Sequence, residues 1–239
     1  PPPSPPPSPP PSPPPSEDSD SCEDRIRKPW SVLTEEEKKL YVKAFKKLAD
    51  KGTAQKLSRT HEQNAQHRNL YFLPWHRGFV MVMEDAIREL GDEFKCFSMP
   101  YWDWSIKPVS SVLDKDYLGT DSQGQCLDDG SKFEKDNYDP ERGDCLIRDI
   151  DSNVCLRRDV NSNVCLRPAR QSNNVCSFSK SEPLMENYIT ATGAYYFPRF
   201  SRNLELRPHG LPHVCIGGPN NLGQMATFYS PDDPIFYLL

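Results

Sequence analysis

The chain has 239 residues, of which 36% are hydrophobic and 26% are charged, and its formal net charge is −5. This length suits one domain of ordinary size with a tail. The basic residues neither dominate nor cluster, which argues against a nucleic-acid-binding protein. No apolar run approaches the ~18–20 residues that a membrane-spanning helix needs. We therefore expect a single globular domain with no nucleic-acid partner and no membrane partner.

The chain opens on a low-complexity tail, because residues 1–16 are four copies of Pro-Pro-Pro-Ser. Such a run favours an extended polyproline II rod, and the residues that follow up to Glu23 are acidic and polar. We predict a disordered tail or linker at 1–21 and one folded domain at 22–239. The run resembles proline-rich stretches of cell-wall and secreted proteins, so cell-wall contact is one hypothesis and a spacer without a partner is the other. The chain begins with Pro and shows no secretory signal, which indicates a processed product or a fragment.

A capping box of Thr34 and Glu37 predicts the start of a first helix. Apolar residues recur every four positions from Leu40 to Leu48, so we expect this helix to run to Gly52. We predict a second helix over residues 53–60, which extends at most to His61, and a third over residues 74–91, with Pro74 at its first position. Helical character returns at about 183–196. A short helix opens at His209 and ends at Gly217-Gly218, and residues 230–239 would enter a further helix.

The middle of the chain is polar and rich in cysteine. The eight cysteines occupy positions 22, 96, 126, 145, 155, 165, 176 and 215. An even count permits four disulfides, and we infer an oxidising, extracellular compartment; several free buried thiols are the alternative. A short repeat begins at Cys145, Cys155 and Cys165, too short and polar for a solenoid with its own core. We interpret residues 120–182 as a cysteine-stapled surface insertion.

The five histidines of the chain fall in two clusters, and none lies in the tail or the insertion. His61, His67 and His76 form one cluster, and His209 and His213 form the other. Neutral imidazole is a good copper ligand, and a nitrogen-only set disfavours the usual zinc and iron patterns. The distribution therefore predicts a centre that binds two metal ions.

The spacing within each cluster limits how the rings meet. His209 and His213 are four residues apart, so on a helix they share one face. His61 and His67 would lie about 120° apart on a continuous helix, so they converge only if the chain turns between them. We expect His67 in a loop and His76 in the first turn of the third helix. The alternatives are a pair at 209 and 213 without metal, and an ordinary helix-end histidine at 61.

Three segments resemble one known family. The string from His67 to Glu84 resembles the first copper signature of the tyrosinases, catechol oxidases and polyphenol oxidases. Residues 99–104, Met-Pro-Tyr-Trp-Asp-Trp, resemble the family's Leu-Pro-Tyr-Trp-Asp-Trp segment, and residues 224–236 resemble the stretch leading into its second copper signature. The likeness covers 22–239 apart from the insertion. It implies a mainly α fold, an antiparallel four-helix bundle that houses a dicopper site, with long loops and little β structure.

The resemblance also implies the cofactors and their ligands. His61, His67 and His76 would bind one copper ion, and His209 and His213 the second. In the family a sixth histidine follows Asp-Pro-x-Phe after three further residues, a position that comes directly after Leu239. We therefore expect a truncated domain whose fourth helix and sixth ligand are missing and which is inactive alone.

The reaction that the resemblance implies is the oxidation of o-diphenols, and in some members monophenols, to o-quinones by dioxygen. The partners are then dioxygen and a small phenol. The rival interpretations are haemocyanin-like oxygen binding and a structural, wall-associated protein with an incomplete copper site. Many relatives also crosslink a cysteine to the second ligand of the first copper ion; no cysteine lies near His67 in the sequence, so we predict no thioether.

Four further residues receive roles from the resemblance. Phe236 would pack on a ligand ring, or serve as plain core filler. Gly210 stands where efficient monophenol hydroxylases of the family often carry Asn, which favours diphenol oxidation here. Glu205 would be the glutamate that helps to deprotonate a phenol, or a surface or capping residue. Val214 would line the substrate entrance, or be an ordinary buried valine.

Overall fold

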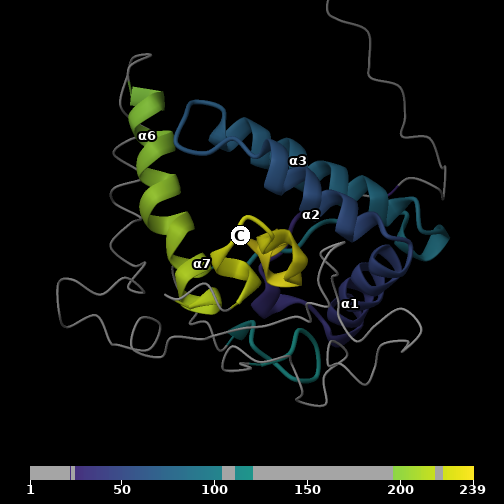
Figure 1. The fold of residues 1–239 in the computed structure, drawn as a ribbon. Helices are drawn as coiled ribbons and strands as arrows, with labels where there is room; N and C mark the ends of the chain where they lie inside the picture. Colours follow the sequence, from purple (N-terminus) through teal and green to yellow (C-terminus); the bar gives the residue numbers. More distant parts are fainter. Residues whose placement is uncertain (1–21, 23–24, 104–110, 121–195, 219–222) are drawn as a thin grey trace, which may run out of the picture.

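The computed structural model describes residues 22, 25–103, 111–120, 196–218 and 223–239. These residues form helices joined by loops, with two isolated β-bridges and no strand among them (Figure 1). The predicted mainly helical fold is confirmed, whereas the four-helix bundle stays a prediction. The tail at 1–21 and the insertion beyond Thr120 lie outside the described residues. No described helix combines the length and the apolar character that a bilayer crossing requires.

The first helix, α1 (Glu35–Asp50), begins at the predicted capping box. Glu37 N donates to Thr34 Oγ1 at 3.2 Å, and Thr34 N donates to Glu37 Oε2 at 2.9 Å. The chain leaves the helix through Gly52, whose φ of 72° lies in the left-handed region that glycine adopts without strain. The face of α1 that enters the core consists of Tyr41, Val42, Ala44, Phe45, Leu48 and Ala49.

The next two helices differ from their predicted bounds. Helix α2 (Thr53–Asn64) runs beyond Thr60, so His61 lies within the helix. Helix α3 (Phe72–Arg88) starts two residues before Pro74. The helix tolerates Pro74 in its first turn, because the N–H groups there have no intrahelical acceptor and the missing N–H of proline costs no hydrogen bond. His76 therefore lies in the second turn of α3, and the prediction that it lies in the first turn is wrong.

The helix that carries the last two histidines is continuous. Helix α6 (Tyr196–Leu204) passes through a π-helical turn, η6 (Glu205–His209), into α7 (Gly210–Gly217). The prediction that a helix opens at His209 is wrong. Pro208 cannot donate to an i−4 carbonyl, but a π turn inserts one extra residue and lets the helix continue through it. The predicted helical segment at 183–196 lies almost wholly outside the described residues.

The end of α7 packs against the turn that follows. The helix ends at Gly217 as predicted, and Gly218 has a φ of 77°. A Cβ atom on Gly217 would lie 2.1 Å from Ala226 N in η7 (Gln224–Ala226). Only glycine therefore permits this approach of α7 to η7.

The C-terminal residues form a buried 3-10 helix, η9 (Pro234–Leu238). Tyr41 Oη donates to the Pro234 carbonyl at 2.5 Å, and Trp102 N donates to the Leu238 carbonyl at 2.7 Å. All five residues of η9 are buried, and residues 235–238 belong to the same hydrophobic core as α1–α3. The final stretch thus lies at the centre of the described structure, where Figure 1 shows the C-terminus among the helices.

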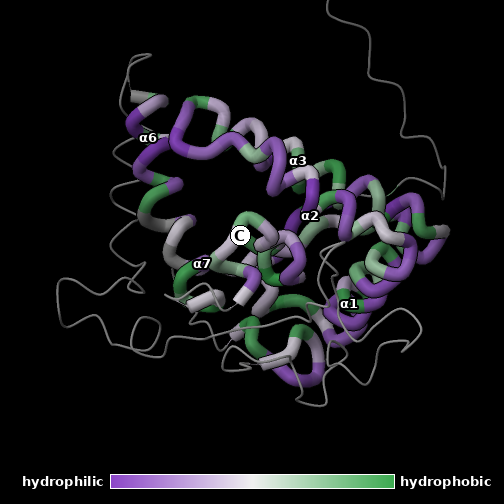
Figure 2. Tube along the Cα trace, in the orientation of Figure 1, coloured by the Kyte–Doolittle hydropathy of each residue, from purple (hydrophilic) through white to green (hydrophobic). Residues whose placement is uncertain are grey.

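The N-terminal strap, which we define as residues 25–33, runs beside the segment that contains Tyr101. Trp30 N donates to Tyr101 O at 2.6 Å, and Tyr101 N donates to Lys28 O at 3.0 Å. Figure 2 shows hydrophilic and hydrophobic residues alternating along α1–α3, as expected for helices that bury one face. The 3-10 helices η1 (Trp30–Val32), η2 (Asp92–Phe94) and η8 (Ser230–Asp232) complete the described elements.

The described cysteines are all oxidised. Cys22 and Cys96 form a disulfide, and Cys215 of α7 is also disulfide-bonded. The alternative of free buried thiols is therefore wrong for these three positions. The other cysteines of the sequence lie outside the described residues.

Candidate metal centre

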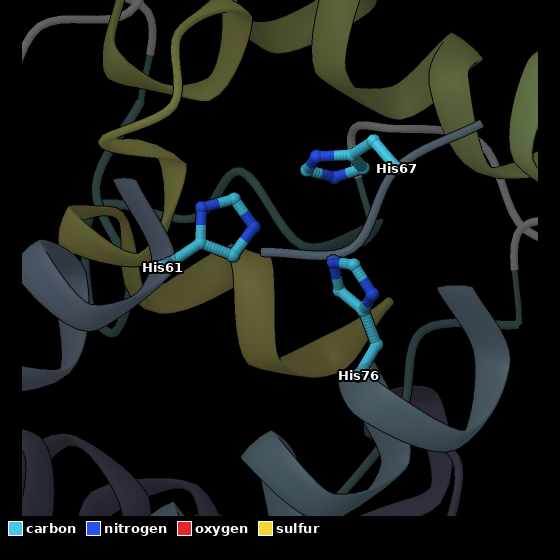
Figure 3. A group of neighbouring side chains, drawn as sticks. All are labelled: His61, His67 and His76. Carbon is cyan, nitrogen blue, oxygen red and sulfur yellow. The ribbon is translucent and has the colours of Figure 1, made fainter. Parts of the chain in front are cut away.

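Three histidines from three different segments meet in one place. His61 lies in α2, His67 in the loop that follows it, and His76 in α3. Their ligand nitrogens lie within 4.8 Å of one another, and their ring centroids are 5.0–5.5 Å apart. Figure 3 shows the three rings surrounding a common space. We call this group the first half-site.

The chain turns between His61 and His67, as their spacing requires. Helix α2 ends at Asn64, and Arg68 adopts a φ of 58°, the one positive φ of a non-glycine residue in the described ranges. A left-handed conformation costs an L-residue roughly 1–2 kcal/mol. The turn is held by Glu205, because Arg68 N donates to its Oε1 at 2.7 Å and its Oε2 at 2.8 Å.

Backbone carbonyls orient two rings of the first half-site. His61 Nδ1 lies 2.7 Å from Phe228 O, and His76 Nδ1 lies 2.8 Å from Phe72 O. A carbonyl oxygen only accepts, so Nδ1 carries the proton and the Nε2 of the neutral ring keeps its lone pair. Both Nε2 atoms are buried and have no hydrogen-bond partner in the described structure. Such unpaired, inward-facing nitrogens fit a bound metal ion.

The second half-site, which we define as His209 and His213, lies on one helical segment. The two Nε2 atoms are 3.1 Å apart, and His213 Nδ1 lies 2.6 Å from Met225 O. Because the Met225 carbonyl only accepts, Nδ1 of His213 carries the proton. The Nε2 atom of His213 is then the unprotonated nitrogen, and it faces His209. His209 lies against the first half-site, with its ring centroid 5.8 Å from that of His76. The two half-sites therefore form one continuous centre.

Burial keeps the five histidines neutral. It lowers the pKa of His61 to about 4, of His76 to about 3 and of His213 to about 4. Burial also lowers the pKa of His67, where the Glu205 carboxylate opposes the shift, and the pKa of His209. Because a histidine must be unprotonated to bind a metal ion, all five are ready ligands at neutral pH.

Aromatic rings surround the histidines. Phe236 lies 5.1 Å from the His61 ring and 6.0 Å from the His213 ring, so it contacts both half-sites. Phe72 packs in the same way on His76 at 4.6 Å and on His209 at 4.9 Å. An apolar shell of this kind limits the access of water to a metal centre.

An apolar cavity of about 280 Å³ lies against both half-sites. Its wall includes His76 of the first half-site and His209 of the second, together with Phe72, Leu204 and Phe236. A small molecule therefore has a route to the histidines within the described part of the chain.

The four remaining sequence-predicted residues lie around the second half-site. Glu205 is 7% exposed, so the alternative of a surface residue is wrong. Val214 is 39% exposed, which overturns the alternative of a buried valine. Gly210 N donates to Glu205 O, and a Cβ atom at position 210 would lie 3.1 Å from that oxygen. The catalytic roles of these residues and of Phe236, and the absence of a thioether at His67, stay predictions.

The residues that orient the rings could not be predicted from the side-chain pattern. Phe228, Phe72 and Met225 act through their backbone carbonyls, which every residue type has. Phe228 also places its own ring 5.7 Å from that of His67, although the side chain is 59% exposed. Its place beside His67 could not be predicted from sequence spacing, because Phe228 lies in a loop far along the chain.

The described helices thus bring together a triad of histidines that could hold a metal ion and an adjacent histidine pair, and imidazole nitrogen is a donor that copper favours. The family described as the common central domain of tyrosinase matches residues 42–239, and the chain belongs to this type 3 copper family. A tyrosinase of Streptomyces galbus is 30% identical over 236 residues, which cover 89% of this chain and 78% of that protein. A tyrosinase of Streptomyces antibioticus is 30% identical over 232 residues, with the same two shares. Hemocyanin 1 of Megathura crenulata is 26% identical over 171 residues, which cover 70% of this chain and 4% of that protein.

Proposed function

We propose that the protein oxidises o-diphenols to o-quinones with dioxygen as the electron acceptor. The observation that carries this proposal is the continuous centre of five neutral histidines, of which His61 is buried and the others are partly buried, and the described ligand cluster contains no thiolate and no carboxylate. Two diphenols give up four electrons and four protons in all, and these convert one dioxygen to two waters. The family supports a phenol oxidase, and the choice of o-diphenols is our own.

The histidines fit two copper ions. His61, His67 and His76 would hold one ion, and His209 and His213 would hold the second through their adjacent Nε2 atoms. When bound, the copper pair would supply the binding of dioxygen and the transfer of electrons from the phenol to it. The resemblance places a sixth histidine directly after Leu239.

The side chains around the centre favour diphenols over monophenols. Hydroxylating a monophenol requires a group that removes the proton of a weakly acidic phenol. Gly210 offers no side chain for this task, and both oxygens of the Glu205 carboxylate already accept from Arg68 N. We place Val214 at the substrate entrance, because it is exposed next to His213.

The test is oxygen uptake by the chain in its full natural length after loading with copper. We expect catechol to consume dioxygen and form quinone, and a monophenol such as tyramine to react far more slowly. His76→Ala serves as the inactive control. Reversible dioxygen binding without turnover of catechol would instead favour a haemocyanin-like carrier, and fewer than one copper ion per chain would favour a structural protein.

We also propose an extracellular location. The disulfide between Cys22 and Cys96 supports it, because such bonds persist mainly in oxidising compartments. Contact of the tail at 1–21 with a cell wall stays a hypothesis. Cell fractionation with an antibody against the domain, before and after removal of the tail, separates secretion from wall attachment.

A further inference from the structure

Glu205 connects the two half-sites by a hydrogen bond that crosses 137 positions of the sequence. Glu205 is the first residue of the π turn that ends at His209, and its carboxylate accepts from the peptide N–H that joins His67 to Arg68. The side chain is 7% exposed, so water competes little for the bond. One end of the bond lies on the helical segment that carries the second half-site, and the other end lies next to His67 of the first.

The peptide that receives this bond is the one that needs support. Arg68 holds a φ of 58°, a conformation that L-residues other than Asn and Asp seldom adopt. His67 is also the one member of the first half-site that lies outside a helix. Within the described residues, His61 and His76 each have a hydrogen bond from Nδ1 to a backbone carbonyl, whereas His67 has none. Apart from ring contacts with Phe72 and Phe228, the orientation of the His67 ring therefore depends on the backbone that carries it.

The π turn fixes the other end of the bond. The Glu205 carbonyl accepts from Gly210 N, five residues later, and this bond closes the wide turn. A side chain at position 210 would press on the same carbonyl, because its Cβ would lie 3.1 Å away. Glycine at this position therefore leaves Glu205 free to reach Arg68.

We propose that Glu205 is a positioning residue, which holds His67 in place for metal binding by accepting from Arg68 N. The proposal rests on the proposed function in so far as His67 is a metal ligand. It differs from the role that the family resemblance gives Glu205, namely help in deprotonating a phenol. A proton acceptor needs its negative charge, whereas a positioning residue needs only an oxygen that accepts a hydrogen bond.

Glu205→Gln and Glu205→Ala separate these two roles. Gln keeps an acceptor oxygen and removes the charge, whereas Ala removes both. The probe is Co²⁺ alone, titrated into the metal-free chain and followed by its visible absorption, a readout that needs no turnover. We expect Glu205→Gln to bind within about threefold of the unaltered chain, and Glu205→Ala to lose tenfold to a hundredfold, the range for removing a partner that orients a ligand.

Substitutions of Arg68 test the same bond from its donor side. Arg68→Gly keeps the N–H and suits a positive φ, so metal affinity should equal or exceed that of the unaltered chain. Arg68→Pro removes the N–H and forces φ to about −65°, so it should lose at least as much affinity as Glu205→Ala. Far-UV circular dichroism and thermal unfolding show whether each variant is folded. This pair keeps the test decisive even if Glu205→Ala does not fold.

Two results would overturn the proposal. One is an unchanged Co²⁺ affinity in Glu205→Ala, and the other is an equal loss in the Gln and Ala variants. Failure of the proposed function is a separate outcome, because a chain that binds metal as expected but leaves catechol unoxidised keeps the positioning role and loses the enzymatic one.

Discussion

The two half-sites are built in different ways. The second half-site draws both histidines from one helical segment, where a spacing of four residues brings the Nε2 atoms to 3.1 Å. The first half-site draws its three histidines from α2, a loop and α3, and needs a left-handed residue between them. The geometry of the second half-site is therefore mainly local, whereas that of the first depends on how separate segments pack.

This difference determines which changes should disrupt the ligand geometry of each half-site. A local pair keeps its spacing as long as its helix survives. A tertiary triad loses its geometry when any one of three segments shifts, and ligand sets of this kind assemble together with the fold. Both half-sites contact the aromatic rings of Phe72 and Phe236, so these rings connect the half-sites in addition to the Glu205 bond.

The largest effect should come from acid, which acts on both half-sites at once. Burial lowers the pKa of His61, His76 and His213 to about 3–4 from the ordinary value of 6.5. Between these values the unfolded chain binds more protons than the folded one, so the stability of the metal-free protein falls as the pH drops from 6.5 toward 4. Each histidine contributes about 1.4 kcal/mol per pH unit within its window. Urea denaturation at several pH values measures the slope, and a flat profile would contradict the neutral, buried state of these rings.

Gly217→Ala should disturb the packing that supports the second half-site. The added Cβ would lie 2.1 Å from Ala226 N, so α7 must move away from η7, the turn whose Met225 carbonyl orients His213. We expect a loss of about 3 kcal/mol in the free energy of unfolding. Gly78→Ala in α3 is the matched control, since a Cβ there meets nothing within 4 Å. It should be neutral or stabilise by up to about 1 kcal/mol, and equal losses in the two variants would refute the steric argument.

Removal of one ligand should distinguish the half-sites by their metal content. His61→Ala leaves the first half-site with two ligands on separate segments. We expect the affinity of this half-site for Co²⁺ to fall by more than about a hundredfold, because even the loss of a residue that only orients a ligand costs up to about a hundredfold. His213→Ala should leave the first half-site nearly unaffected. Equilibrium dialysis gives the stoichiometry, and an equal loss in both variants would show that the half-sites do not bind independently.

Phe236→Leu should give the smallest effect and sharpen the comparison. The ring contacts His61 and His213 edge-on, and contacts of this kind contribute about 0.5–1.5 kcal/mol beyond buried area. We expect about 1 kcal/mol of destabilisation by urea denaturation. The double variant with Phe72→Leu should lose more than the sum of the single losses if the two rings couple the half-sites, and an additive result would show that they act separately.

The sequence predicted what side-chain patterns encode. The capping box of α1, the turn between His61 and His67, and the two histidine clusters are all present as expected. The π turn was missed because it depends on the helix continuing through Pro208, where the local pattern indicates a start. The orienting bonds to Phe72, Met225 and Phe228 were missed because they use carbonyl oxygens, and the role of Glu205 at Arg68 because no spacing rule joins residues so far apart.

The disulfide between Cys22 and Cys96 spans 74 positions and makes that stretch of chain a covalent ring. All three histidines of the first half-site lie inside the ring, and both histidines of the second lie outside it. Closing a loop of this length lowers the conformational entropy of the unfolded chain, which raises its free energy by about 4 kcal/mol. The first half-site, which draws on three segments, thus lies in a stretch of chain that stays joined at both ends when the protein unfolds. His61, His67 and His76 are near one another in the sequence, so the ring adds little to their own proximity. It instead confines α1, α2 and α3, the helices that must pack together before the triad forms, whereas the pair on the helix needs no such confinement.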